Sequence, residues 1–315
     1  MPHKNLLNST SQIVALVICL IGTGMFLFGN AAKLKKNIAT VSLQSASKQK
    51  SDKIDKVAAE ISVKILDQDF LGSGFIVQQQ GDRYTVVTNQ HVLRAGESPY
   101  RIQTPDGKIH SAVVADSLKS DYEYDLALLE FRSNNQYSTA KIGSSVFLEV
   151  GEPIFAVGFP YSDTKAQSRK IKSGLAIKTG RVAVILNQAL VEGYQIAYTN
   201  DVKKGMSGGA LFNSRGEVVG VNGKHAYPLW ESPELYQDGS QPCPELEQLI
   251  TRSSLAIPIE KSIELNPQLD LRAKFDLDEI RTSNLLSQNP QLVAQMQAEA
   301  EATAKSCENY HYDGE

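Results

Sequence analysis

Short runs of β-branched and aromatic residues, separated by turn residues, occupy the chain from residue 59 to residue 262. They predict one set of strands before the polar stretch 132–151 and a second set after it. The first set lies near 60–66, 73–78, 83–89, 108–115 and 126–131. The second set lies near 152–158, 173–186, 194–199, 209–213, 216–222 and 254–259. Short strands in two sets of about six predict an all-β fold of two antiparallel β-barrels.

The N-terminal region has a different pattern. No charged residue occurs between positions 5 and 32, and positions 13–28 are almost entirely apolar. This apolar core is intermediate between that of a signal peptide and a membrane span, which needs about 17–25 residues. Gly29 and Ala31 are small residues at a spacing that signal peptidases accept. Residues 1–32 are therefore expected to form an apolar helix, either a signal peptide or a membrane anchor.

Two further segments lack the strand pattern. Residues 33–56 carry seven lysines among polar residues, which predicts a flexible linker, although such a run can also meet anionic lipid headgroups. These lysines follow the apolar segment and favour a cytoplasmic C-terminal side, whereas an N-terminal apolar segment usually serves export. The tail 263–315 holds ten acidic and four basic residues, and Pro290 predicts the start of a weakly packed helix.

Composition and charge exclude several classes of protein. The 315 residues include 32 basic and 35 acidic side chains, and this balance argues against a nucleic-acid binder. With three cysteines and no paired Cys/His spacing, neither a metal nor another cofactor is expected. In an oxidising compartment Cys243 and Cys307 can pair, which would attach the tail to the long segment 226–251.

A serine with glycines on both sides is the first candidate for chemistry. The sequence GMSGGAL covers 205–211, with Ser207 at its centre. A glycine at 205 lets the backbone turn so that its own N–H and that of Ser207 converge on one point. Two converging donors are what a tetrahedral oxyanion requires. Glycine-rich turns often carry serine, so this motif is only moderately specific alone.

Two further segments supply partners for the serine. His91 follows an apolar strand in TNQHVL, where its imidazole can accept the serine proton. Asp125 immediately precedes the apolar strand LALLE, where a buried carboxylate can orient that imidazole. A locally hydrogen-bonded histidine and a strand-capping aspartate are the simpler alternatives. The three residue types in this order, each at a strand edge, predict a catalytic triad.

The chain resembles the trypsin-fold serine peptidases, and among them the bacterial proteases of the HtrA/Deg type. The resemblance covers about 60–262 and rests on GSGFIV, TNQHVL, DLALLE, GEPIFAVGFP, TGRV, GMSGGALF, GEVVGVNG and SLAIPI, in that order. It implies a protease domain over 57–262, with barrels at about 57–131 and 150–262 and an active site between them. No PDZ-like domain is expected after it.

The resemblance also implies roles for individual residues. His91 would be the general base, Asp125 its orienting partner and Ser207 the nucleophile, with the N–H groups of Gly205 and Ser207 forming the oxyanion hole. One position departs from the family, because Met206 stands where aspartate or asparagine is usual. This departure leaves open whether the Gly205 N–H points into the oxyanion hole.

Substrate specificity remains open at this stage. Asp201 lies six residues before Ser207, the spacing at which trypsin-like enzymes place a pocket carboxylate that recognises Arg or Lys. It also resembles an aspartate that HtrA proteins carry slightly further upstream of the serine, where it has no such role. The strand ending in Gly223, Lys224 and His225 is expected to pair with the main chain of the substrate.

The sequence therefore predicts a serine endopeptidase that acts on protein or peptide substrates through an acyl-enzyme. We expect it to be exported to the bacterial periplasm or anchored in the membrane through 13–28, and we expect no nucleic-acid partner. The alternative is a catalytically silent trypsin-fold module that binds peptides or scaffolds partners, which Met206 favours. A third possibility is an enzyme whose oxyanion loop forms only with substrate or partner.

Overall fold

The structure is a computed structural model that describes residues 52–115, 123–161, 169–170, 174–227, 234–266, 269 and 290–307. The apolar helix expected within 1–32 and the linker up to residue 51 lie outside the described residues. Within the described ranges, no helix is both long enough and apolar enough to cross a membrane.

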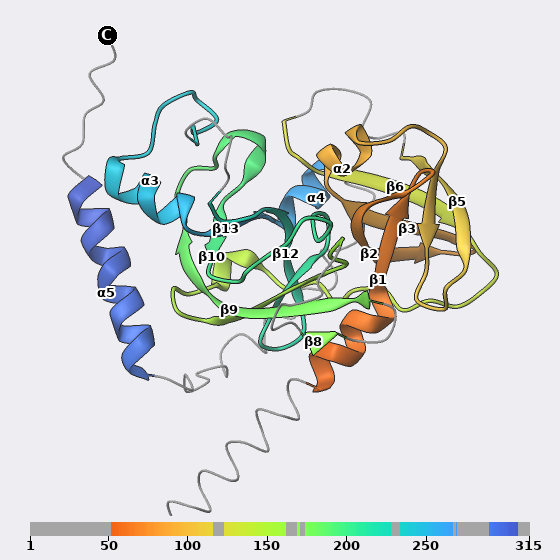
Figure 1. The fold of residues 1–315 in the computed structure, drawn as a ribbon, viewed down its shortest axis with the longest axis horizontal. Helices are drawn as coiled ribbons and strands as arrows, with labels where there is room; N and C mark the ends of the chain where they lie inside the picture. Colours follow the sequence, from red (N-terminus) through yellow and green to blue (C-terminus); the bar gives the residue numbers. More distant parts are fainter. Residues whose placement is uncertain are drawn as a thin grey trace, which may run out of the picture. The chain divides into compact units, whose positions relative to one another are not determined.

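The first barrel is a closed ring of six antiparallel strands in the order β1-β2-β3-β6-β5-β4 (Figure 1). Its strands are β1 (Ser62–Leu66), β2 (Phe70–Gln80), β3 (Arg83–Thr88), β4 (Tyr100–Gln103), β5 (Ile109–Val114) and β6 (Ala127–Arg132). Short helix α2 (Gln90–Arg94) follows β3. The ring encloses alternate side chains such as Val63, Ile65 and Ile102, because successive strand residues point to opposite faces.

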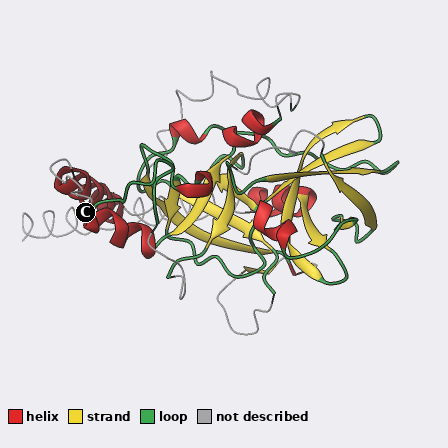
Figure 2. Ribbon diagram, turned by 90° about the horizontal axis from the view of Figure 1, so that it is seen from above, coloured by secondary structure: helices red, strands yellow, loops and turns green. Residues whose placement is uncertain are grey.

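The second barrel follows with β7 (Pro153–Gly158), β9 (Ala176–Ile185), β10 (Ile196–Tyr198), β11 (Ala210–Asn213), β12 (Val218–Lys224) and β13 (Ser254–Pro258). These six strands are linked in the order β10-β13-β12-β11-β7-β9, and pairing of β10 with β9 closes the ring. The short β8 (Arg169–Lys170) pairs with the start of β9, on the edge opposite β7. Figure 2 shows the two barrels side by side, so the expected pair of six-stranded antiparallel barrels is confirmed.

The structure differs from the sequence-based prediction at the start of the first barrel. Residues 52–61 are helical, although lysines run to position 56 and a strand was expected from residue 60. Ile54, Ala58 and Ile61 are buried in the main hydrophobic cluster. Their spacing of four and three residues places them on one helix face, and this face packs despite the polar residues between them.

The C-terminal part contains helices α3 (Pro244–Thr251), α4 (Glu260–Leu265) and α5 (Pro290–Cys307). The α5 helix has no buried residue and lies beside α3 (Figure 1). A disulfide between Cys243 and Cys307, with Cα atoms 5.6 Å apart, joins the two helices. The expected C-terminal helix is therefore present, and the structure pairs the two cysteines whose pairing the sequence left open.

Candidate active site

His91 and Asp125 form a tightly bonded pair in the first barrel. His91 lies in the short α2 helix, and Asp125 lies just before β6, which pairs with β3. The Asp125 carboxylate accepts the His91 backbone N–H at 2.8 Å and contacts the His91 ring Nδ1 at 2.6 Å. The carboxylate is 1% exposed and the imidazole 41% exposed. A carboxylate facing Nδ1 places the ring proton there, which leaves Nε2 as a proton acceptor.

Ser207 lies in the loop that leads into β11. Its hydroxyl donates a hydrogen bond to the Gly223 carbonyl at 3.1 Å. Within the part of the chain that the structure describes, no hydrogen bond joins Ser207 Oγ to the His91 ring. The serine hydroxyl therefore rests against the end of β12, and it must rotate before it can give its proton to a histidine.

The Asn89 side chain links the histidine–aspartate pair to the serine loop. Its Nδ2 donates to the Asp125 carbonyl at 2.7 Å, and its Oδ1 accepts the Gly208 N–H at 2.6 Å. Gly208 has a φ of 80°, and a Cβ there would overlap the Ser73 carbonyl and the Thr88 hydroxyl. The absence of a side chain at 208 therefore allows the loop to approach the first barrel closely.

Ser73 provides a second connection between the barrels. Its hydroxyl donates to the Gly205 carbonyl at 2.7 Å and accepts the Phe159 N–H at 2.8 Å. Its own N–H donates to the Ser207 carbonyl at 2.9 Å. One buried side chain of β2 thus contacts the serine loop and the end of β7 together.

The loop also contains the two backbone N–H groups that the resemblance assigns to an oxyanion hole. Neither the Gly205 N–H nor the Ser207 N–H donates to another residue in the described ranges. The Lys204 carbonyl accepts the Tyr161 N–H at 3.0 Å. Since the C=O and N–H of a trans peptide point in opposite directions, the Gly205 N–H is directed away from Tyr161. Two unused donors around a serine are suited to receiving an oxyanion.

Met206, the departure in this motif, is completely buried. It packs in the second barrel's cluster with Leu148, Val202 and Leu211, and its N–H donates to the Lys203 carbonyl at 2.9 Å. The apolar side chain therefore anchors the loop to the barrel through packing.

The four expected substrate-binding residues are in different environments. Asp201 is 66% exposed and ion-paired with Lys203 at 2.7 Å, so nothing encloses its carboxylate. Gly223 lies in β12 and accepts the Ser207 hydroxyl, as described above. The Lys224 ammonium pairs with Glu234 at 2.9 Å, and His225 is exposed.

Sequence reasoning missed three polar residues that bond to the site. Asn89 and Ser73 lie within motifs that drew attention to other residues. Tyr194 belongs to no motif, yet its buried hydroxyl donates to the Asp125 carboxylate. A buried tyrosine needs a hydrogen-bond partner, but the sequence does not reveal which partner it has.

The family model of the trypsin-like peptidase domain matches residues 72–221, a range that contains His91, Asp125 and Ser207. Residues 72–221 are a trypsin-like peptidase domain. The double barrel agrees with this assignment, which confirms the resemblance found in the sequence.

Curated relatives of the trypsin-like peptidase domain are bacterial serine proteases. A probable serine protease Do-like of Buchnera aphidicola is 34% identical over 48% of this chain and 29% of its own length. A probable periplasmic serine endoprotease DegP-like of Pseudomonas putida is 31% identical over 63% of this chain and 35% of its own. The serine endoprotease DegS of Escherichia coli is 30% identical over 48% and 39%. The chain spans about a third of the length of these relatives.

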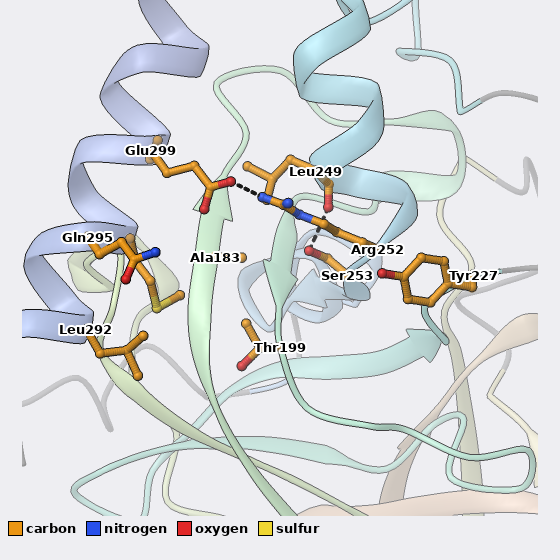
Figure 3. Close-up of a pocket in the computed structure, with 11 residues that line it drawn as sticks. Ala183, Thr199, Tyr227, Leu249, Arg252, Ser253, Leu292, Gln295 and Glu299 are labelled. Atoms are coloured by element: carbon orange, nitrogen blue, oxygen red, sulfur yellow. Dashed lines mark hydrogen bonds and ion pairs between the residues drawn. The ribbon is translucent and has the colours of Figure 1, made fainter. Parts of the chain in front are cut away.

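A pocket of about 270 Å³ lies where α5 approaches α3 and β9 (Figure 3). Arg252 at the end of α3 and Glu299 of α5 form an ion pair in its wall. None of its lining residues belongs to the serine, histidine and aspartate constellation. In the described ranges, no cluster of three His, Cys, Asp or Glu side chains is placed to hold a metal.

Proposed function

We propose that this chain is a serine endopeptidase in which Ser207 is the nucleophile, His91 the general base and Asp125 its orienting partner. The observation that carries the proposal is the buried Asp125 carboxylate, which bonds to two nitrogens of His91. The Asn89 bridge from Asp125 to Gly208 supports it, because it holds the serine loop against this pair.

In the proposed reaction, the Ser207 hydroxyl leaves the Gly223 carbonyl and gives its proton to His91 Nε2. Its oxygen attacks the peptide carbonyl, and the resulting oxyanion accepts hydrogen bonds from the Gly205 and Ser207 N–H groups. His91 then protonates the leaving amine, which produces an acyl-enzyme. Water then loses a proton to His91 and attacks the ester carbonyl. As the bond from the acyl carbon to the Ser207 oxygen breaks, His91 returns the proton to that oxygen, which releases the acid and regenerates the serine.

The substrate class and the location belong to the same proposal. We infer that protein or peptide substrates bind beside β12, since the Ser207 hydroxyl rests on its Gly223 carbonyl. The apolar segment 13–28 would export the chain or anchor it on the periplasmic side of a membrane, and relatives named as periplasmic endoproteases support this location.

A second candidate is a silent peptide-binding module. The observation that favours it is the bond from the Ser207 hydroxyl to Gly223, since the hydroxyl is not bonded to His91. In an enzyme, by contrast, this bond would be exchanged when substrate arrives, because catalytic hydrogen bonds often tighten only in the substrate complex.

Fluorophosphonate labelling with mass spectrometry separates the two candidates. The full chain should acquire an adduct at Ser207, Ser207→Ala should acquire none, and His91→Ala should label at least about 100-fold more slowly, because general-base assistance is worth about that much. Ser138→Ala removes an exposed serine and should label like the parent. No Ser207 adduct, even with peptides added, would contradict the enzyme and favour the binding module.

A further inference from the structure

Asp125 accepts a third hydrogen bond that the proposed reaction does not use. Besides the two bonds from His91, its Oδ2 accepts the hydroxyl of Tyr194. Tyr194 is fully buried and lies just before β10 of the second barrel, whereas Asp125 belongs to the first. The oxygen that faces the imidazole is therefore also held from the opposite barrel.

The backbone around Tyr194 is shaped to bring this hydroxyl to Asp125. The Asp125 N–H donates to the Glu192 carbonyl at 2.8 Å. Glu192 has a φ of 65°, a conformation rarely adopted by residues other than glycine, and Gly193 follows with a φ of 87°. Such conformations persist where surrounding contacts determine them. The turn therefore bonds to Asp125 through both its backbone and its tyrosine.

Gly223 makes room for the Tyr194 ring. A Cβ at position 223 would overlap the phenol oxygen and the adjoining ring carbons. On the same ring, the Lys224 ammonium lies 4.8 Å from the centroid, and Glu234 holds that ammonium at 2.9 Å. The ring is thus confined by the strand whose Gly223 carbonyl also holds the Ser207 hydroxyl.

The Tyr194 hydroxyl acts as a donor throughout the pH range in which a histidine base works. Burial, together with the charge of Asp125 and the hydrogen bond to it, raises the pKa of Tyr194 well above its ordinary value. The phenol therefore keeps its proton, and Asp125 keeps the acceptor role in this bond.

We propose that Tyr194 is a positioning residue, whose hydroxyl fixes the Asp125 carboxylate so that Oδ2 faces the Nδ1 of His91. This inference rests on the proposed function, because it assigns Tyr194 to the same serine, histidine and aspartate constellation. Without the phenol hydroxyl, the buried carboxylate loses its only side-chain donor other than His91 among the described residues. It can then rotate, and the imidazole it orients rotates with it.

The test compares Tyr194→Phe with Tyr84→Phe in the full chain. Tyr84 is equally buried, and its hydroxyl donates to the Asn135 carbonyl at 2.9 Å within the first barrel. Labelling by a fluorophosphonate concentration series gives a maximal rate and a half-saturating concentration. Tyr194→Phe should lower the maximal rate about ten- to a hundredfold, the size expected for one hydrogen bond to a charged group. It should leave the half-saturating concentration within about twofold, since only orientation changes.

Proton NMR supplies a readout that does not depend on activity. The resonance of the His91 Nδ1–H proton should move in Tyr194→Phe and stay in place in Tyr84→Phe, with thermal midpoints confirming that both variants fold. Equal labelling rates and an unmoved resonance would overturn the role of Tyr194 while leaving the serine peptidase intact. If the parent itself does not label, the proposed function fails, and the resonance alone decides whether Tyr194 orients the pair.

Discussion

Gly223 combines two requirements at one residue. Its carbonyl accepts the Ser207 hydroxyl, and its missing side chain leaves space for Tyr194. One requirement is the position of the backbone carbonyl, and the other is the empty space where a side chain would lie. Adding a single methyl group at residue 223 therefore tests both. Gly220, three positions earlier in the same strand, offers a comparison, because a Cβ there would meet its nearest atom at 3.0 Å.

We expect Gly223→Ala to reduce Ser207 labelling at least about tenfold and to lower the free energy of unfolding by about 1–3 kcal/mol, the usual cost of overpacking. The methyl group must displace the Tyr194 ring or the strand. Labelling rates and urea unfolding measure the two effects. Gly220→Ala should keep most of the labelling rate, and an equal loss in both variants would argue against a specific fit at 223.

At the residue scale, the sequence predicted the proposed reactive groups but not the residues that hold them. His91, Asp125 and Ser207 stand in motifs whose local context indicates their chemistry. Tyr194 lies 69 residues from Asp125 along the chain, and their bond exists only because the barrels meet there. A local pattern of hydrophobic and polar residues cannot predict a hydrogen bond between residues so far apart in the sequence.

At the scale of elements, the strand pattern predicted most of both barrels. It missed β4, whose four residues YRIQ bury only Tyr100 and Ile102. The helix at 52–61 and α3 were also missed, because each is short and its few apolar residues alternate along the sequence with charged ones. The strand expected over 194–199 is shorter, at Ile196–Tyr198, since the turn before it serves Asp125. Tertiary contacts determine the type and the bounds of these elements, and the hydrophobic periodicity of one sequence does not reveal such contacts.

The turn between β11 and β12 contains a carboxylate that stabilises the fold in a pH-dependent way. Burial alone would raise the pKa of Glu217, but hydrogen bonds from Asn213, Lys141 and Arg215 outweigh it and hold the pKa below its usual value. The Glu217 side chain is only 7% exposed, so solvent screens these contacts little. A group with a lowered folded-state pKa stabilises the protein above its unfolded pKa and loses this contribution as pH falls.

Glu217→Gln should therefore lower the thermal unfolding midpoint at neutral pH by several degrees. The difference from the parent should shrink as pH falls below about 4.3, the ordinary glutamate value, because the parent's carboxylate is then progressively protonated. Melting curves from pH 7 to pH 3 for both proteins measure this convergence. A difference that stays constant over that range would mean that the charge of Glu217 contributes no stability.

At the scale of the whole molecule, the disulfide joins two regions with few other contacts. The two cysteines are 64 residues apart in the sequence, and α5 itself buries no side chain. The chain-entropy estimate for a loop of this length is about 4 kcal/mol, as an upper value. The pocket under α5 contains none of the proposed catalytic residues. The bond should therefore affect stability and tail attachment more than chemistry.

Cys307→Ser should lower the free energy of urea unfolding by up to about 4 kcal/mol while Ser207 labelling stays within about twofold of the parent. Limited proteolysis should cut within α5 sooner. Cys243→Ser should behave identically, and Ser306→Ala, a neighbouring exposed change, should resemble the parent. A large loss of labelling in both cysteine variants would instead connect the tail to the active site.

The hydrogen bonds of Ser73 have a consequence for the entropy of the reaction. Because one buried residue of the first barrel holds the Gly205 and Ser207 carbonyls of the second, the serine loop is ordered when the barrels fold together. The conformational freedom of this loop is therefore lost during folding, before any substrate arrives. In the proposed mechanism, the rotation of the Ser207 hydroxyl from Gly223 toward His91 then remains as the adjustment between the resting site and a near-attack geometry.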